Sequence, residues 1–275
     1  GIDNYYSSTE TPGYAHSYLI SGVLSPDYVD MTGDGISDDD LGSAVKFNYT
    51  LVNPSYQWRA PYNENKAKYD EGLRSNPNDN TGSYVYGEKE IWHLHSIEGK
   101  THVGIFFISP REDGLGVTGI KGGQNQGAVS YKLDSIGLYS KRELQELGAD
   151  AVPIKMVHFR YSYELCKGIE NSKNGAGKLT LKEIFFTYGK SHKGRLNSYV
   201  FDYNNDASHT YHLSAYDRWG TYAPPRNGST SMSTNSEYPY TSQIKSEADE
   251  YAALWNLNKI VLPSGGVINV NYEAD

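Results

Sequence analysis

The stretch Val157-His158-Phe159-Arg160-Tyr161 alternates apolar or aromatic side chains with polar ones. A period of two places its first, third and fifth side chains on one face of a β-strand and the polar ones on the other. The pattern apolar-x-aromatic-or-valine-x-tyrosine occurs five times, at Val45-Phe47-Tyr49, Val157-Phe159-Tyr161, Ile184-Phe186-Tyr188, Tyr199-Phe201-Tyr203 and Ile268-Val270-Tyr272. This recurrence predicts a strand unit that is used repeatedly, as in solenoid or spiral sheets.

A second short motif, Leu-x-x-Ile, accompanies the strand pattern at Leu133/Ile136, Leu181/Ile184 and Leu257/Ile260. The last of these opens the strongest hairpin signal in the chain. Pro263-Ser264-Gly265-Gly266 separates Asn258–Leu262 from Val267–Tyr272, and its glycines can adopt the positive φ of a tight reversal. We therefore expect an antiparallel pair of strands here.

Helix signals are few. Ser140 and Glu143 have the spacing of a capping box, and Gly148 supplies a stop, so a short helix is expected over Lys141–Leu147. A second is expected from Ser246 to about Trp255. With 25 tyrosines and only 7 phenylalanines among 275 residues, the composition favours half-buried strand surfaces. The predicted class is all-β, with twisted antiparallel sheets in a spiral or a sandwich, and the chain divides into regions 1–130 and 131–275.

The charge and composition exclude several classes of function. The net charge is −8 and no run of basic residues is long enough to follow a phosphate backbone, so nucleic acid is not an expected partner. No stretch reaches the length of an apolar membrane-spanning helix. The single cysteine, Cys166, lies among apolar residues and is expected to be a small buried side chain. Strand-like residues close to the C-terminus suggest a piece of a longer protein.

The strongest chemical signal is the acidic stretch from Asp30 to Asp40, Asp-Met-Thr-Gly-Asp-Gly-Ile-Ser-Asp-Asp-Asp. Calcium loops supply oxygen ligands from positions 1, 3, 5, 7 and 9 and carry glycine at position 6. Those positions correspond to Asp30, Thr32, Asp34, the carbonyl of Ile36, and Asp38, with Gly35 at the turn. All these donors are hard oxygens, which Ca²⁺ prefers. Leu41 replaces the glutamate of an EF-hand, so Asp39 or Asp40 would provide the last carboxylate in a non-helical site.

Other candidate sites are weaker. His93 and His95 share one predicted strand face, and His209 and His212 form His-x-x-His, but no third zinc ligand can be named. Glu88 and Glu90 read as a solvated strand face. Together with Trp58, Trp92, Trp219 and Trp255, however, acidic residues leave open an alternative function in binding or hydrolysing glycans.

The segments Tyr216-Asp-Arg-Trp-Gly-Thr-Tyr222 and Leu257 to Glu273 resemble bacterial Rhs/YD-repeat proteins, in which a Trp-Gly-Tyr segment precedes a Leu-x-x-Ile-x-x-Pro-x-Gly-Gly hairpin that ends in Tyr-Glu. The acidic loop resembles calcium loops of allied proteins. The resemblance implies a long spiral of strands that forms a shell, which in some members encloses a toxic domain. This chain lacks regular YD repeats, a toxin domain and the self-cleavage core.

These observations together predict a non-catalytic structural or interaction module of a large secreted or surface-exposed bacterial protein. It would be stabilised by Ca²⁺ and located outside the cell or on its surface. The expected partners are the rest of a larger parent chain or other surface proteins, and in the alternative reading glycans.

Overall fold

The computed structural model describes residues 8–67, 82–212, 215–216, 220–224 and 244–273. These residues form a sheet of ten strands in which every neighbouring pair is antiparallel, and a separate two-stranded ribbon. The prediction of an all-β chain is confirmed. The large sheet consists of β1 (Gly22–Leu24), β2 (Ala44–Ala60), β3 (Val85–Glu98), β4 (His102–Pro110), β7 (Tyr131–Ser140), β8 (Lys155–Leu165), β9 (Lys178–Tyr188), β10 (Tyr199–Tyr203), β11 (Leu257–Val261) and β12 (Val267–Asn269).

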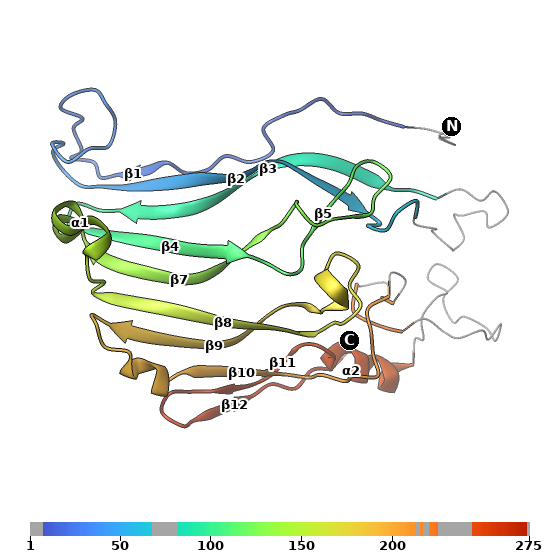
Figure 1. The fold of residues 1–275 in the computed structure, drawn as a ribbon. Coiled ribbons are helices and arrows are strands. Elements are labelled where there is room, and N and C mark those ends of the chain that lie inside the picture. Colours follow the sequence, from blue (N-terminus) through green and yellow to red (C-terminus); the bar gives the residue numbers. More distant parts are fainter. Residues whose placement is uncertain (1–7, 68–81, 213–214, 217–219, 225–243, 274–275) are drawn as a thin grey trace.

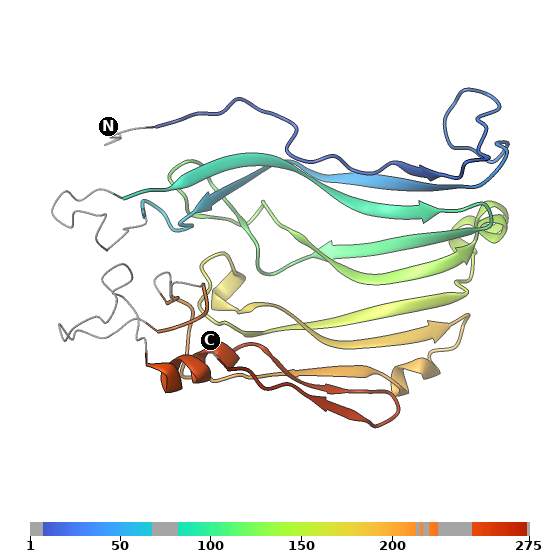
Figure 2. The same ribbon diagram turned by 180° about the vertical axis from the view of Figure 1, so that it is seen from behind.

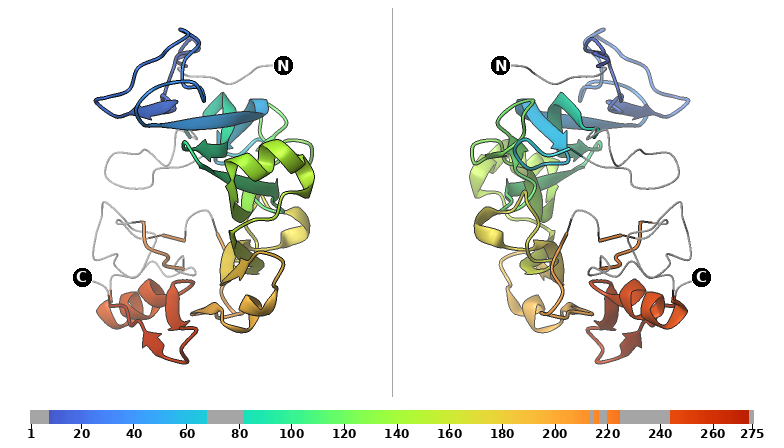
Figure 3. Two further views of the ribbon diagram at one scale, coloured as in Figure 1. Left: turned by 90° about the vertical axis from the view of Figure 1, so that its left-hand side faces the viewer. Right: turned by 90° about the vertical axis from the view of Figure 1, so that its right-hand side faces the viewer.

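Strand order in this sheet follows the order along the chain, so each strand lies beside its predecessor (Figure 1). The regions 1–130 and 131–275 share the sheet, because β4 pairs with β7. Seen from behind, the sheet keeps this uninterrupted order (Figure 2). Seen along its strands, it is curved, with the β1 end and the β11–β12 end bent toward the same side (Figure 3).

Both short helices expected from the sequence are present. Helix α1 spans Lys141–Leu147, with the Ser140 hydroxyl accepting from the Glu143 amide (3.4 Å) and Gly148 as C-cap. Helix α2 spans Lys245–Ala253, one residue earlier than expected, and has Ile244 at its N-cap without a side-chain hydrogen bond. Three short 3₁₀ segments cover Gly148–Asp150, Lys173–Gly175 and Lys193–Leu196. Neither α1 nor α2 is long enough to cross a membrane, and the same holds for every helix of the described residues.

The four central hairpins of the sheet are copies of one unit. In each hairpin a phenylalanine of the first strand faces an isoleucine of the second. The four pairs are Phe47–Ile97 in β2–β3, Phe106–Ile136 in β4–β7, Phe159–Ile184 in β8–β9 and Phe201–Ile260 in β10–β11. The alternating pattern in the sequence includes three of these phenylalanines but not Phe106, because Gly104 and Ile108 stand two positions to either side of Phe106, where the other units have Val or Tyr.

The Leu-x-x-Ile motif marks a β-bulge in each unit. In β9 the register passes from Arg160–Glu183 directly to Tyr161–Leu181, so Lys182 is an extra, unpaired residue. The same one-residue shift follows Leu133 in β7 and Leu257 in β11, and it occurs after Leu94 in a fourth Leu-x-x-Ile motif on β3. A bulge adds one residue to one strand. Leucine and isoleucine three positions apart can therefore both lie on the face that carries the phenylalanines.

Successive units are displaced by a constant amount. The isoleucine of one unit faces the residue two positions before the phenylalanine position of the next, at Ile97–Gly104, Ile136–Val157 and Ile184–Tyr199. At about 3.3 Å per residue, each hairpin is staggered by about 7 Å along the strand direction. A sheet with a constant stagger coils as it grows, because strand stagger and sheet curvature are linked.

Connections within a unit leave the sheet at the end opposite α1 (Figure 1). One of them, between β4 and β7, contains the ribbon of β5 (Gly116–Val117) and β6 (Gln124–Asn125). Leu115 and Val117 are the largest fully buried side chains among the described residues. The ribbon lies against β2, since a Cβ on Gly116 would come within 2.7 Å of the Gln57 carbonyl oxygen. A small core is thus formed beside the sheet.

Polar residues reinforce this core. The Arg111 guanidinium donates two hydrogen bonds to Asp113 (2.8 and 2.7 Å), which also accepts from the Leu179 amide (2.8 Å). Nearby, Cys166 is buried with a φ of 53°, and burial raises the pKa of its thiol. This agrees with the buried structural role expected for Cys166, because a protonated thiol is a poor nucleophile.

Candidate metal centre

The acidic loop connects β1 to β2 at the end of the sheet where α1 lies (Figure 1). Its base is closed by backbone pairing: Ser25 N donates to Ser43 O (2.9 Å), and Val29 and Leu41 form an antiparallel bridge. The loop tip is therefore held as a separate turn above the sheet edge.

Asp30, Thr32 and Asp34 are brought together at this tip. One oxygen of the Asp30 carboxylate accepts from the amides of Thr32 (3.3 Å) and Gly33 (2.6 Å), and the other accepts from the amide of Gly35 (3.0 Å). The Thr32 hydroxyl donates to Asp34 (2.8 Å). Gly33 and Gly35 have φ of 77° and 88°, a region that favours glycine. The first three predicted ligands thus share one glycine-bent turn.

The other two predicted ligands contact lysines of the protein. The carbonyl oxygen of Ile36 accepts from Lys46 Nζ of β2 (3.2 Å). Asp38 forms an ion pair with Lys141 at the start of α1 and accepts from Gln145 Nε2 (3.0 Å). The Lys141 ammonium lowers the pKa of the Asp38 carboxyl. Asp38 therefore ties the loop to α1 here, rather than pointing to the same place as Asp30 and Asp34.

Asp40 is the organising residue that sequence analysis treated only as a spare carboxylate. It is buried and accepts from the Tyr28 hydroxyl (2.7 Å) and from the amides of Ser37 (2.8 Å) and Met31 (3.1 Å). The hydrogen bond from Tyr28 lowers the pKa of Asp40, and the same bond raises the pKa of Tyr28 to about 12. The charges of Asp40, Asp30 and Asp34 add to this rise in the pKa of Tyr28.

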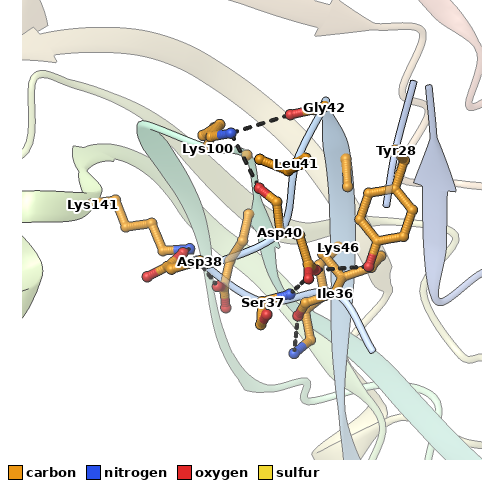
Figure 4. Close-up of a pocket in the computed structure, with 13 residues that line it drawn as sticks. Tyr28, Ile36, Ser37, Asp38, Asp40, Leu41, Gly42, Lys46, Lys100 and Lys141 are labelled. Atoms are coloured by element: carbon orange, nitrogen blue, oxygen red, sulfur yellow. Dashed lines mark hydrogen bonds and ion pairs between the residues drawn. The ribbon is translucent and has the colours of Figure 1, made fainter. Parts of the chain in front are cut away.

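A small cavity of about 40 Å³ lies beneath the loop (Figure 4). Three lysines line it from different elements: Lys46 from β2, Lys100 from the β3–β4 turn and Lys141 from α1. Lys100 Nζ donates to the carbonyl oxygens of Asp40 (3.4 Å) and Gly42 (3.2 Å). The lysines thus hold the lower half of the loop on the sheet through backbone oxygens and Asp38.

The upper half of the loop keeps its negative charge. In the part of the chain that the structure describes, Asp30, Asp34 and Asp39 take part in no ion pair with a lysine, arginine or histidine. Within the described ranges no three His, Cys, Asp or Glu side chains converge in the manner of a metal site. Of the five predicted ligands, the structure brings only Asp30, Thr32 and Asp34 together at the loop tip.

Among the described residues, neither histidine pair gathers with a third His, Cys, Asp or Glu side chain into a metal-type cluster. His95 is the bulge residue of β3, while His93 faces Thr50 and contacts the Tyr131 ring edge-on (5.9 Å). His209 Nδ1 lies 2.8 Å from Asp206 Oδ2, and its ring contacts those of Tyr222 and Tyr251. His209 is thus part of an aromatic cluster beside α2.

The carboxylates considered for glycoside chemistry are held by their own strand neighbours. Glu88 accepts from Tyr86 (2.7 Å), Ser55 (3.0 Å) and Gln57 (3.1 Å). Glu90 accepts from Trp92 Nε1 (2.8 Å). These bonds match the solvated strand face that the i, i+2 spacing predicts. Trp255 packs on Tyr222 with ring centroids 4.4 Å apart, and Trp219 lies outside the described residues.

Comparison with known proteins finds no matching family, no similar curated protein and no solved structure with a similar fold.

Proposed function

We propose that this chain is a non-catalytic structural or interaction module of a large secreted or surface-exposed bacterial protein. Its staggered sheet would form part of the wall of a β shell, and Ca²⁺ would stabilise the acidic loop at one end. The observation that carries the proposal is the fourfold hairpin unit with its constant displacement of two residues. A wall built from identical increments can extend while it coils, which suits an enclosing structure.

The face that carries the repeated phenylalanines supports an interaction role. We call it the aromatic face and define it by Phe47, Phe106, Phe159 and Phe201. Cross-strand register places Trp92 and Tyr188 on the same face, where they are 43% and 57% exposed. Monomeric proteins rarely expose large contiguous apolar surfaces unless a partner covers them. In the proposed shell, this face would contact other parts of the parent protein or its contents.

The charge and geometry of the loop tip support the calcium part of the proposal. Asp30 and Asp34 are close together without an ion pair among the described residues, and like charges at short range destabilise the folded loop. A bound Ca²⁺ would neutralise them with Asp30, Thr32 and Asp34 as ligands. Ile36 and Asp38 would join only if Lys46 and Lys141 moved away from them. The ion would stiffen the loop and supply no catalytic step.

Thermal unfolding with and without calcium tests this part of the proposal. At a free calcium concentration 100 times the dissociation constant, binding to the folded form alone adds about 2.7 kcal/mol. For a chain of this size that is a rise in Tm of about 5–10 °C. Asp34→Ala should abolish the rise, whereas Asp206→Ala, in a loop far along the chain, should keep it. Equal curves in Ca²⁺ and in EGTA would rule out a calcium role.

Dye binding tests the interaction role. The hydrophobic dye ANS reports exposed apolar surface. Leu138 lies two residues after Ile136 on the same face and is 40% exposed. The native chain should bind the dye, and a variant with Trp92→Lys, Leu138→Lys and Tyr188→Lys should bind much less. Phe107→Lys is the matched control, because Phe107 is 40% exposed on the opposite face. If the triple variant binds the dye as well as the control does, the aromatic face is not an open apolar surface and the proposal loses its support.

A glycan array tests the alternative. Trp58 and Trp92 are both partly exposed on the β2–β3 hairpin, where a sugar could stack on an indole ring. Specific glycan binding that Trp58→Ala or Trp92→Ala removes would favour the glycan-binding reading over the structural one.

A further inference from the structure

The two outermost strands of the sheet each represent half of the hairpin unit. In the complete units, the isoleucine of one unit faces the residue two positions before the phenylalanine position of the next. Ile260 of β11 faces Ile268 of β12, so Val270 occupies the phenylalanine position and Tyr272 the tyrosine position. β12 is therefore a first strand, and its outer edge is where the second strand of its unit would pair.

β1 is the complementary half. Val23 faces Val45, which lies two positions before Phe47, so Val23 occupies the isoleucine position and Ile20 the leucine position. A hydrogen bond supports this alignment. Tyr49 Oη donates to the carbonyl oxygen of Ile20 (3.0 Å), just as Tyr161 and Tyr203 donate to those of Leu133 and Leu181 (2.7 Å each). β1 is thus a second strand whose first strand would lie on its outer edge.

The directions of the backbone N–H and C=O groups at the two edges agree with this alignment. The Val270 amide donates to Asn258 O (2.8 Å), so the backbone groups of Val270 point inward, toward β11. Ser25 N donates to Ser43 O (2.9 Å) and Phe47 N donates to Ser21 O (2.9 Å), so residues 21, 23 and 25 point inward to β2. Val270 and Val23 would therefore face each other as a non-hydrogen-bonded pair, with free backbone groups of Asn269 and Leu24 beside them.

Both edge strands are only three residues long, but the two edge segments carry no charged residue and no proline that would block strand pairing. Lysine, proline or an inward-pointing charge normally blocks an exposed edge. Residues 20–24 (Ile-Ser-Gly-Val-Leu) and 267–272 (Val-Ile-Asn-Val-Asn-Tyr) contain no charged residue and no proline. Val23 and Val267 are each 50% exposed.

We propose that the segment 267–272 of one copy, which begins with β12, pairs antiparallel with the segment 20–24 of a second copy, which ends with β1, so that Val270 faces Val23 and Tyr272 faces Ile20. The junction completes a fifth hairpin unit from two half units. Because the two edges differ, the contact is head to tail, and the stagger of the sheet makes the product an open chain of copies rather than a closed dimer. The proposal rests on the repeat alone and is independent of calcium.

Cysteine trapping tests the register. A non-hydrogen-bonded pair has Cα atoms about 4.5 Å apart, within the range for a disulfide. Val23→Cys and Val270→Cys proteins, mixed under mild oxidation, should form mixed disulfide dimers. The control mixture is Val267→Cys with Val23→Cys. Val267 lies three positions before Val270, out of register with Val23, so this mixture should form few disulfide dimers. The native chain controls for Cys166, which is buried. Equal yields from the two mixtures, or an excess of symmetric dimers, would overturn the proposal.

Sedimentation measures self-association without cross-linking. The native chain should associate more as its concentration rises, in Ca²⁺ and in EGTA alike. Asn269→Pro removes an outward-pointing amide and leaves the pairing of β12 with β11 intact, so it should weaken association about tenfold or more. Asn269→Ala keeps the amide and should associate like the native chain. A native chain that stays monomeric at every concentration, or a proline variant that associates normally, would refute the head-to-tail contact.

Discussion

Deletion of Lys182 tests whether the bulge is what allows the leucine and the isoleucine of the Leu-x-x-Ile motif to lie on the same face of a strand. With Lys182 present, Leu181 faces Tyr161 and its carbonyl oxygen accepts from the Tyr203 hydroxyl (2.7 Å). Without it, strict alternation would move Leu181 to the opposite face while Ile184 stayed in place. The fold would then lose one leucine contact and one interstrand hydrogen bond in a single step.

The expected loss in free energy of unfolding follows from the burial of Leu181 and from its hydrogen bond. A fully buried leucine contributes about 1.5–3 kcal/mol, and this half-buried one about half of that. The hydrogen bond adds about 1 kcal/mol. The deletion should therefore lower the free energy of unfolding by about 2–2.5 kcal/mol, which corresponds to a fall in Tm of about 4–10 °C for a chain of this size.

Differential scanning calorimetry measures the effect, and Lys182→Ala is its matched control. The alanine variant keeps the bulge. It loses the ion pair between Lys182 and Glu164 (2.8 Å), which is partly exposed and contributes about 0–1 kcal/mol, and the contact of the Lys182 ammonium with the Tyr203 ring (5.5 Å from Nζ to the ring centroid). If the deletion and the alanine variant melt at the same temperature, the bulge is not needed to keep Leu181 on the aromatic face and the explanation of the motif is wrong.

Three further predictions concern the loop and the small core. Asp40→Asn should destabilise the chain at neutral pH, and the difference from the native chain should vanish in acid: the lowered pKa of Asp40 contributes stability above its usual value of 3.8, and that stability is lost as the pH falls through the folded-state pKa. Gly42→Ala should lower Tm more than Gly33→Ala, since both have positive φ (78° and 77°) but only at Gly42 would the Cβ meet a backbone oxygen, at 2.4 Å. Asp113→Ala should cost about 3–5 kcal/mol in urea unfolding because it leaves a half-buried arginine without its partner, whereas Glu146→Ala, in an exposed i,i+4 pair, should cost less than about 0.5 kcal/mol.

The sequence predicted the strands where alternation is unbroken. The Val157–Tyr161 pattern and the hairpin around Gly265 appear as expected, because period-two burial dictates the face of each side chain in an unbroken strand. The bulges were not predicted. A spacing of three between leucine and isoleucine looks like a helical interval or a broken strand, and only the pairing partner reveals the extra residue.

The core and the loop contacts depend on residues far apart in the chain. Leu115 and Val117 lie in a glycine-rich connection with no strand alternation, so their burial follows from the ribbon packing against β2. The clustering of Asp30, Thr32 and Asp34 at the loop tip was predictable from local spacing. The engagement of Asp38 by Lys141 was not, because it joins residues 103 positions apart.

The hairpin unit fixes the middle of each strand pair and leaves its far connections free. The first strands of the units, β2, β4, β8 and β10, all end at the rim opposite α1, while the turn from β3 to β4 at the other rim needs only residues 99–101. Because the Phe–Ile pairs lie inside the strands, insertions at the first rim would leave these pairs in place, and this rim can vary in length and sequence while the sheet keeps its register.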